Sequence, residues 1–396
     1  MTPSSLARHL FSTYERYRLD DLTPQNCKHE RVFAELFDLV VKSDKLMAME
    51  ELGSTIEDRS IQLIRIGRGH KRVLLWSQMH GDESTATLAL MDIFNFFVHS
   101  GHDKKWVREM LDELTLCFIP MLNPDGAERI ERRTAVGIDM NRDALDLATP
   151  EAHILRNAQR RLKPTFGFNL HDQELSSVGN SKNVTALALL APALDEKKTR
   201  PPGRVRAIRV AALIARTLDQ FVHGHLATYD DAFEPRAFGD NMQRWGTSTV
   251  LIESGHWPDD GRKIFIRKLN YVGILSALHG ISNGSYQDVD MDYYTHLVPN
   301  GKRVYDLIIR GVKLRHQTGW SHAVDIGLSI DPQLNKEPDK AIVTIKDLGD
   351  LKAYGALRTV DGASRVVSTN QIVVNQSISA VKLFGILQLP NIDANR

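Results

Sequence analysis

Hydrophobic and polar positions follow different patterns in three parts of the chain. Residues 1–50 repeat their apolar positions at helical spacing, as at Val32, Leu36, Leu39 and Val40, which predicts a helical N-terminal lead-in. From about residue 51 to 285, short runs rich in β-branched and aromatic residues alternate with longer periodic runs. After about residue 286 the runs are short and strand-like, and little helical periodicity remains.

The middle part, residues 51–285, predicts an α/β domain. The expected strands are Ile61–Ile66, Val73–Gln78, Leu114–Met121, Phe166–Leu170, Ala186–Leu190 and Thr249–Ile252. The expected helices between them are Ser84–Phe97, Glu151–Leu162, Val205–Phe221 and Lys263–Leu278. Strands that alternate with helices form sheets covered on both faces, so we expect that architecture here.

The last part, residues 286–396, predicts a smaller β-rich accessory domain. Turn signals such as Asp361–Gly362 separate its expected strands, which are Ala341–Ile345, Ala356–Val360, Gln371–Val374 and Val381–Leu387. Binding of a partner and self-association are both open roles for this domain.

The charge balance argues against polyanionic partners. Lys plus Arg number 50 and Asp plus Glu number 49, which leaves a net charge of +1 and no field that would attract nucleic acid or an anionic membrane. The most apolar stretch, Val184–Leu194, contains Pro192 and is far shorter than the ~20 residues of a membrane-spanning helix. Charged residues follow Met1 before any apolar run of signal-peptide length, so we expect a cytoplasmic protein.

Two cysteines, Cys27 and Cys117, are too few for a disulfide framework or a thiolate zinc site. Their scarcity is typical of a reducing compartment. A metal ion in this chain would therefore use histidine and carboxylate ligands.

Polar residues that could bind a metal or take part in catalysis follow four of the expected strands. In chain order they are His80 and Glu83, the turn Asn123–Gly126, His171 with Asp172, and Glu253. Between the second and third groups lie Arg132, Arg133, Asp139, Asn141 and Arg142. In open α/β sheets ligands bind outside the carboxyl ends of the strands, so these groups predict one shared site.

This order of motifs resembles the zinc carboxypeptidase family of the carboxypeptidase A type, the M14 metallopeptidases, over about residues 60–282. The resemblance implies a mixed, largely parallel central sheet flanked by helices on both faces. It also implies an enzyme with one Zn²⁺ per chain, held by His80, Glu83 and His171. Two imidazoles and one carboxylate suit zinc and leave a coordination position open for water.

The resemblance also assigns roles to the other residues of the site. Glu253 would be the general base that activates a metal-bound water, and Arg132 would polarise the scissile carbonyl. Asn141 and Arg142 would bind the free carboxylate of the substrate, and Asp139 would accept a hydrogen bond from His80.

Several assignments stay open at this point. Arg133 could replace Arg132, because a one-residue slip exchanges them. Asp172 could support His171, contact a substrate amine or be an exposed acid. Tyr229 is a loose candidate for the mobile tyrosine of the family, and either Arg236 or Asp240 could point into the pocket that reads the terminal side chain of the substrate.

The favoured function is that of a metallocarboxypeptidase, which removes a C-terminal residue from a peptide. The alternatives are a murein-peptide amidase and a deacylase similar to aspartoacylase or succinylglutamate desuccinylase, which would act on an N-acyl amino acid. The turn Asn123–Gly126 favours the peptidase and its close relative, the amidase, over the deacylase. A non-catalytic module that binds peptide carboxylates would require a lost ligand or base, yet all four residues are present.

Overall fold

The computed structural model describes residues 3–100, 105–330 and 342–387, and the chain divides into two compact units. The larger unit comprises Met1–Gln173, Leu187–Ser254 and Phe265–Val298. The smaller unit comprises Glu174–Ala186, Gly255–Ile264 and Pro299–Arg396. Two short segments of the middle part of the chain thus group with the C-terminal residues.

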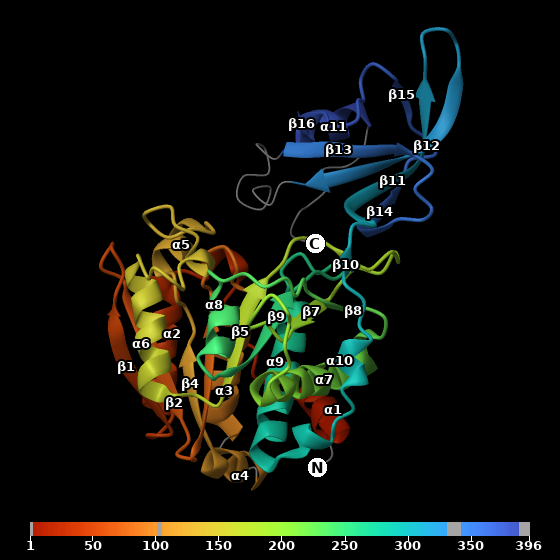
Figure 1. The fold of residues 1–396 in the computed structure, drawn as a ribbon. Helices are drawn as coiled ribbons and strands as arrows, with labels where there is room; N and C mark the ends of the chain where they lie inside the picture. The colour runs from red at the N-terminus through yellow and green to blue at the C-terminus, as the bar shows by residue number, and fades with distance from the viewer. Residues whose placement is uncertain (1–2, 101–104, 331–341, 388–396) are drawn as a thin grey trace. The chain divides into compact units, whose positions relative to one another are not determined.

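The larger unit is built on an eight-stranded mixed sheet with the order β1-β2-β4-β3-β5-β9-β7-β8 (Figure 1). Neighbours are parallel from β4 through β3 and β5 to β9, and antiparallel between β1 and β2, β2 and β4, and β9 and β7. The strands are β1 (Met47–Ser54), β2 (Ser60–Ile66), β3 (Lys71–Ser77), β4 (Leu114–Ile119), β5 (Phe166–Asp172), β7 (Leu187–Leu190), β8 (Leu226–Thr228) and β9 (Ser248–Ser254). All six expected strands are present, and the expected fold class is confirmed.

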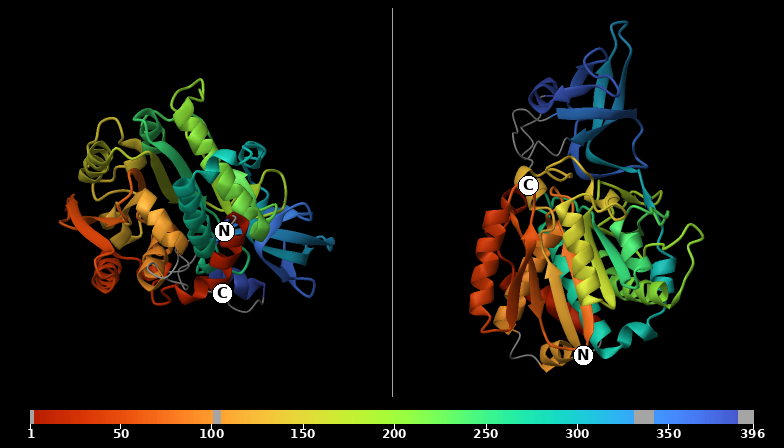
Figure 2. Two further views of the ribbon diagram at one scale, coloured as in Figure 1. Left: turned by 90° about the horizontal axis from the view of Figure 1, so that it is seen from below. Right: turned by 60° about the vertical axis from the view of Figure 1, so that its left-hand side comes forward.

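Helices cover both faces of this sheet (Figure 2). On one face α6 (Pro150–Leu162) and α8 (Phe238–Arg244) bury Leu155 and Met242 against Leu74 and Trp76 of β3. On the other face lie α3 (Thr85–Ser100), α7 (Pro202–Val222) and α9 (Ile264–Asn283), where Phe94 of α3 packs on Phe118 of β4. No helix among the described residues is long and apolar enough to span a membrane.

The remaining helices of this unit have 4 to 14 residues. They are α1 (Pro3–Thr13), α2 (His29–Lys42), α4 (Lys105–Glu113), α5 (Pro124–Arg129) and α10 (Asp292–Thr295). The N-terminal lead-in therefore contains two helices, and its last residues enter strand β1, which the helical spacing did not predict.

A buried ion pair anchors the lead-in to the helices behind the sheet. Arg267 of α9 donates from Nε to Oδ2 of Asp92 in α3 at 2.5 Å, and the two residues are 3% and 0% exposed. The same arginine donates to the backbone oxygens of Leu22 and Leu19, at 2.8 and 3.2 Å. Tyr14 donates to Asp92 at 2.8 Å. The charges are thus fully hydrogen-bonded, which is the condition under which a buried pair is tolerated.

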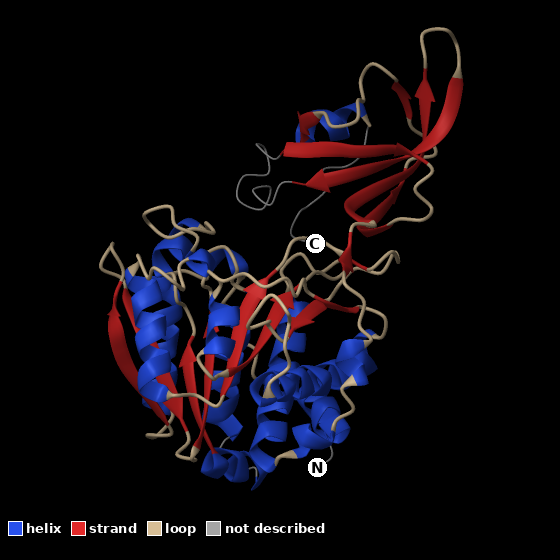
Figure 3. Cartoon of the chain, in the orientation of Figure 1, coloured by secondary structure: helices blue, strands red, loops and turns tan. Residues whose placement is uncertain are grey.

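The smaller unit holds a second sheet with the order β14-β11-β12-β13-β16, and β15 pairs with β11. Its strands are β11 (Val304–Arg315), β12 (Ser321–Ile330), β13 (Ile342–Gly349), β14 (Gly355–Asp361), β15 (Val366–Ser368) and β16 (Ser377–Ser379), and Figure 3 shows them in red. The short pair β6 (Ser177–Val178) and β10 (Asn300–Gly301) also belongs to this unit. The β-rich C-terminal sheet is therefore as expected, although Ala341 lies outside the described residues.

Two expected strands of this region are wrong. Val381–Leu387 lies almost entirely in helix α11 (Ala380–Ile386), because Ser379 caps its first turn and the apolar residues recur at helical spacing at Ala380, Leu383, Phe384 and Leu387. Gln371–Val374 forms turns, and the following Asn375 adopts a positive φ of 65°.

We expect Arg267→Met to lower the free energy of unfolding by about 3–5 kcal/mol, because it leaves the carboxylate of Asp92 buried without its partner. Denaturant unfolding of the full chain measures this. The double variant Asp92→Leu/Arg267→Met should recover part of the loss. Arg129→Met, which removes a surface pair with Glu57, should change stability by less than about 1 kcal/mol. Equal, small effects of Arg267→Met and Arg129→Met would contradict the anchoring role.

Candidate metal centre

Three adjacent parallel strands deliver the expected site residues to one edge of the sheet. The loop after β3 carries His80 and Glu83, β5 carries His171 and β9 carries Glu253. His171 and Glu253 are paired in register, so their side chains project to the same face. The site residues therefore lie at the edge of the sheet formed by the carboxyl ends of these strands, as the sequence predicts.

The turn Asn123–Gly126 holds the loop after β3 in place. The backbone N–H of Asn123 donates to the carbonyl of Gln78 at 3.0 Å, and the Asn123 side chain accepts from the backbone of Gly126 at 3.0 Å. A Cβ on Gly81 would lie 2.0 Å from the carbonyl carbon of Gly126, so only glycine permits this approach. The turn thus supports the ligand loop structurally.

His80, Glu83 and His171 form a compact buried cluster. Their potential ligand atoms all lie within 4.8 Å of one another, and the residues are 2%, 7% and 2% exposed. Nδ1 of His80 is 2.7 Å from one carboxylate oxygen of Glu83, and Nδ1 of His171 is 2.8 Å from the other. Both imidazoles therefore aim the same nitrogen at a shared point.

The hydrogen bonds of His80 favour a cation at that point. Its Nε2 is 3.1 Å from Oδ1 of Asp139, and a hydrogen bond donated to this carboxylate leaves a lone pair on Nδ1. In the neutral ring that lone pair faces a carboxylate oxygen of Glu83, which is also an acceptor, and Nη1 of Arg132 lies 3.1 Å from Nδ1 and 3.3 Å from the same oxygen. A cation between the two acceptors removes the repulsion, and the donor set of two nitrogens and a carboxylate suits zinc. The residues present thus fit the metal.

The pKa shifts in the cluster differ between its two histidines. Burial opposes charge on His80, but the carboxylates of Glu83 and Asp139 outweigh it and raise the pKa of His80. Burial opposes charge on Glu83, but the imidazoles of His171 and His80 outweigh it and hold the pKa of Glu83 well below its ordinary value. Burial also opposes charge on Asp139, but the hydrogen bond and charge of His80 hold the pKa of Asp139 low. Burial lowers the pKa of His171, which favours the neutral imidazole. Ionised carboxylates and neutral imidazole are the forms that coordinate metals.

The two adjacent arginines have different surroundings. Arg132 donates to Oδ2 of Asp139 at 3.1 Å and to Oε1 of Glu83 at 3.3 Å, so it lies beside the cluster. Arg133 instead donates to the carbonyl of Gly137 at 2.9 Å. The structure thus brings Arg132 to the cluster and leaves Arg133 within its own loop.

Asn141 and Arg142 lie next to the segment that leads into α8. Asn141 donates from its backbone to Asp139 at 2.9 Å, and its side chain accepts from the backbone of Phe238 at 2.9 Å. The side chain of Arg142 is 40% exposed, and its Nε lies 3.4 Å from Oε2 of Glu234. The sequence pattern did not single out Glu234, although it lies two positions before Arg236, a candidate for the pocket.

Three residues whose roles the sequence left open, Asp172, Arg236 and Asp240, form hydrogen bonds with neighbouring residues. Thr85 at the start of α3 donates to Asp172 at 2.5 Å. Arg236 donates to Glu234 at 2.8 Å and is exposed. Asp240 is buried, which raises its pKa to about 6, and it accepts from the backbone of Glu234 at 3.3 Å.

Tyr229 and the other histidines play no part in the cluster. The side chain of Tyr229 is 37% exposed. His223, His225 and His256 are outside the one metal-ligand cluster found among the described residues.

Asn169 is a buried polar residue that the sequence reasoning missed. It lies two positions before His171 on β5, so both side chains project to the same face. Neither amide atom has a hydrogen-bond partner among the described residues, and its Nδ2 would be 3.4 Å from a Cβ on Gly239. An amide in the interior of an expected strand is the only sequence signal that could have drawn attention to it.

Comparisons with known proteins agree with this geometry. Residues 34–181 match the family described as Zinc carboxypeptidase. Carboxypeptidase 2 of Trichophyton tonsurans is 26% identical over 104 residues, which is 26% of this chain and 19% of that protein. Carboxypeptidase SOL1 of Arabidopsis thaliana is 21% identical over 182 residues, 42% of this chain and 37% of that protein. The chain thus matches only a fifth to two fifths of these relatives.

Solved structures share the fold. The metallo-carboxypeptidase from Burkholderia cenocepacia matches with a TM-score of 0.52 at 16% identity, over 65% of this chain and 69% of that one. The carboxypeptidase A from Helicoverpa armigera matches with a TM-score of 0.51 at 16% identity, over 71% and 80%. Residues 34–181, which carry the three clustered ligands, are therefore similar in sequence to zinc carboxypeptidases, and the fold is carboxypeptidase-like.

Proposed function

We propose that the chain is a zinc-dependent metallocarboxypeptidase that removes the C-terminal residue of a peptide. The observation that carries this proposal is the buried cluster of His80, Glu83 and His171, with Glu253 paired in register beside it. The family match over residues 34–181 supports a member of the carboxypeptidase type rather than a deacylase.

One zinc ion per chain would be held by His80, Glu83 and His171. Bound there, zinc would supply Lewis-acid chemistry, polarising the scissile carbonyl and making a water molecule more acidic. Asp139 fixes the tautomer and orientation of the His80 ring, which keeps Nδ1 available as a ligand.

Glu253 is proposed as the general base. It is buried at 6% exposure and stands in register with His171, so its side chain projects from the same face of the sheet as that ligand. Its carboxylate would accept a proton from the attacking water and deliver it to the leaving amine. Arg132, beside Glu83, would donate hydrogen bonds to the negative charge that develops on the carbonyl oxygen.

Arg142 is proposed to bind the terminal carboxylate of the peptide, with Asn141 adjacent. A guanidinium fork pairs with a carboxylate through two parallel hydrogen bonds. Arg142 is half-exposed and now lies beside Glu234, and an exposed pair of this kind contributes little free energy. A substrate carboxylate can therefore replace Glu234 at small cost.

We further propose that Asn169 contacts the terminal side chain of the substrate. Its unpartnered buried amide makes an apolar group beside it costly and a polar one favourable.

The metal assignment predicts one zinc per chain in the wild-type protein, measured by elemental analysis after zinc loading and dialysis. His80→Ala should weaken zinc binding by tenfold or more in a competition titration, because it removes one of three protein ligands. His153→Ala removes an exposed histidine of α6 and should leave zinc binding unchanged. A wild type that retains no zinc, or a His80→Ala variant that binds as tightly, would contradict the assignment.

The activity predicts hydrolysis of free-acid peptides and little or none of the same peptides with an amidated C-terminus, measured by release of the terminal residue. Arg142→Gln should raise KM more than it lowers kcat, whereas Arg68→Gln, at an exposed surface arginine, should change neither. Glu253→Gln should retain zinc and lower kcat by about 10²–10⁴-fold. Equal cleavage of acid and amide, or turnover of N-acyl amino acids alone, would refute the peptidase assignment.

A further inference from the structure

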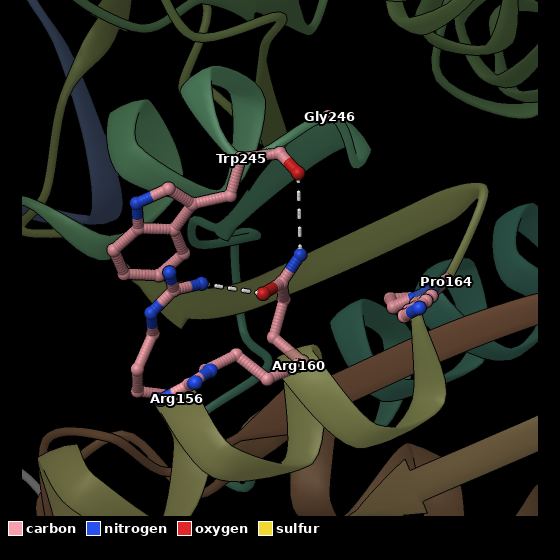
Figure 4. A pocket seen from close by; sticks show the side chains of 7 residues that line it. Arg156, Arg160, Pro164, Trp245 and Gly246 are labelled. Atoms are coloured by element: carbon pink, nitrogen blue, oxygen red, sulfur yellow. Dashed lines mark hydrogen bonds between the residues drawn. The ribbon is translucent and has the colours of Figure 1, made fainter.

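A cavity of about 570 Å³ lies between helix α6 and the residues that follow α8 (Figure 4). Its wall includes Arg156, Gln159 and Arg160 of α6, Lys163 just after it, and Trp245 with Gly246. These residues lead into β5 and β9, whose opposite ends carry His171 and Glu253. At about 3.3 Å per strand residue, the cavity is on the order of 20 Å from the metal centre. It therefore belongs to a different site.

The cavity carries positive charge that the chain does not neutralise. Within residues 3–100, 105–330 and 342–387, no ion pair involves Arg156, Arg160 or Lys163. Their neighbour Arg161, by contrast, is paired with Glu50. Burial, together with the nearby guanidinium of Arg160, lowers the pKa of Arg156, as expected where cations gather without a carboxylate.

The guanidinium of Arg156 is held in a fixed orientation. It lies 3.8 Å from the centroid of the Trp245 ring and donates to Oε1 of Gln159 at 2.5 Å (Figure 4). Gln159 in turn donates to the backbone oxygen of Trp245 at 3.4 Å. A side chain that is already ordered loses less conformational entropy when a ligand binds. Nothing lies within 4 Å of the position of a Cβ on Gly246, so the wall is open there.

We propose that this cavity binds a small molecule bearing a diphosphate or similar multiply charged phosphate group. Arginine forks pair with phosphate oxygens in a bidentate manner, and a lysine adds a point charge. Basic residues in the last turn also offset the helix dipole, which accounts for Arg160 and Arg161 alike. The dipole does not account for the ordered Arg156 or for the cavity. The proposal uses none of the residues of the metal centre, so it is independent of the proposed function.

Pyrophosphate titrated calorimetrically into the full zinc-loaded chain tests this proposal. The wild type should bind, and Arg160→Gln should weaken binding about tenfold or more, equivalent to ~1.4 kcal/mol. Arg161→Gln is the matched control, since it removes the same charge from the same helical turn outside the cavity, and its affinity should remain within about twofold of the wild type. Lys163→Gln, at an exposed residue beyond the helix, should also weaken binding, which keeps the test decisive if a helix variant folds poorly.

Three results would overturn the proposal. The first is no heat of binding in the wild type at millimolar pyrophosphate. The second is an equal affinity in the wild type and in both cavity variants. The same result would arise if pyrophosphate only removed zinc from the metal centre, because neither variant changes a metal ligand. The third is binding that persists in the cavity variants and disappears in Arg142→Gln, which would assign the pyrophosphate to the arginine proposed for the substrate carboxylate.

Discussion

The carboxylate of Glu83, buried between two imidazoles, is the interaction on which the candidate site depends. Removing a carboxylate from water is costly unless charge and hydrogen bonds compensate it. His80, in the loop after β3, and His171, on β5, provide that compensation. Their Nδ1 atoms converge on opposite oxygens of the same group, so the two histidines and the glutamate are positioned mutually. A divalent cation satisfies all three at once, which connects the electrostatics of the fold to its chemistry.

The surrounding structure restricts how this cluster can move. Asp139 orients the ring of His80, and the turn Asn123–Gly126 packs so closely on Gly81 that the ligand loop has little freedom. Parallel pairing of β5 with β9 sets Glu253 beside His171, and both residues lie on strands and not on loops. Ligands on strands and tight turns are held more precisely than ligands on long loops, and such precision is what a metal centre requires.

Much of this could be predicted from the sequence because strand ends are easy to recognise and ligands concentrate there. The strands before His80, His171 and Glu253 are runs of apolar, β-branched and aromatic residues, and an α/β sheet brings their carboxyl ends together. The sequence could not tell which of Arg132 and Arg133 lies beside the metal ligands, because the direction of each side chain depends on how their loop folds. The partner of Arg142, Glu234, lies 92 positions further along the chain, and only tertiary packing reveals it. Val381–Leu387 was misread because a short apolar run fits a strand or a helix until the cap at Ser379 is considered.

The location of the metal tests the account most directly. Crystals of the zinc-loaded protein, measured with X-rays at the zinc absorption edge, would show the ion by its anomalous scattering. The account predicts one peak per chain, at about 2.0–2.2 Å from Nδ1 of His80, Nδ1 of His171 and the carboxylate of Glu83. An ion bound elsewhere, or a zinc-loaded crystal in which both histidines remain hydrogen-bonded to Glu83 with no peak between them, would contradict it.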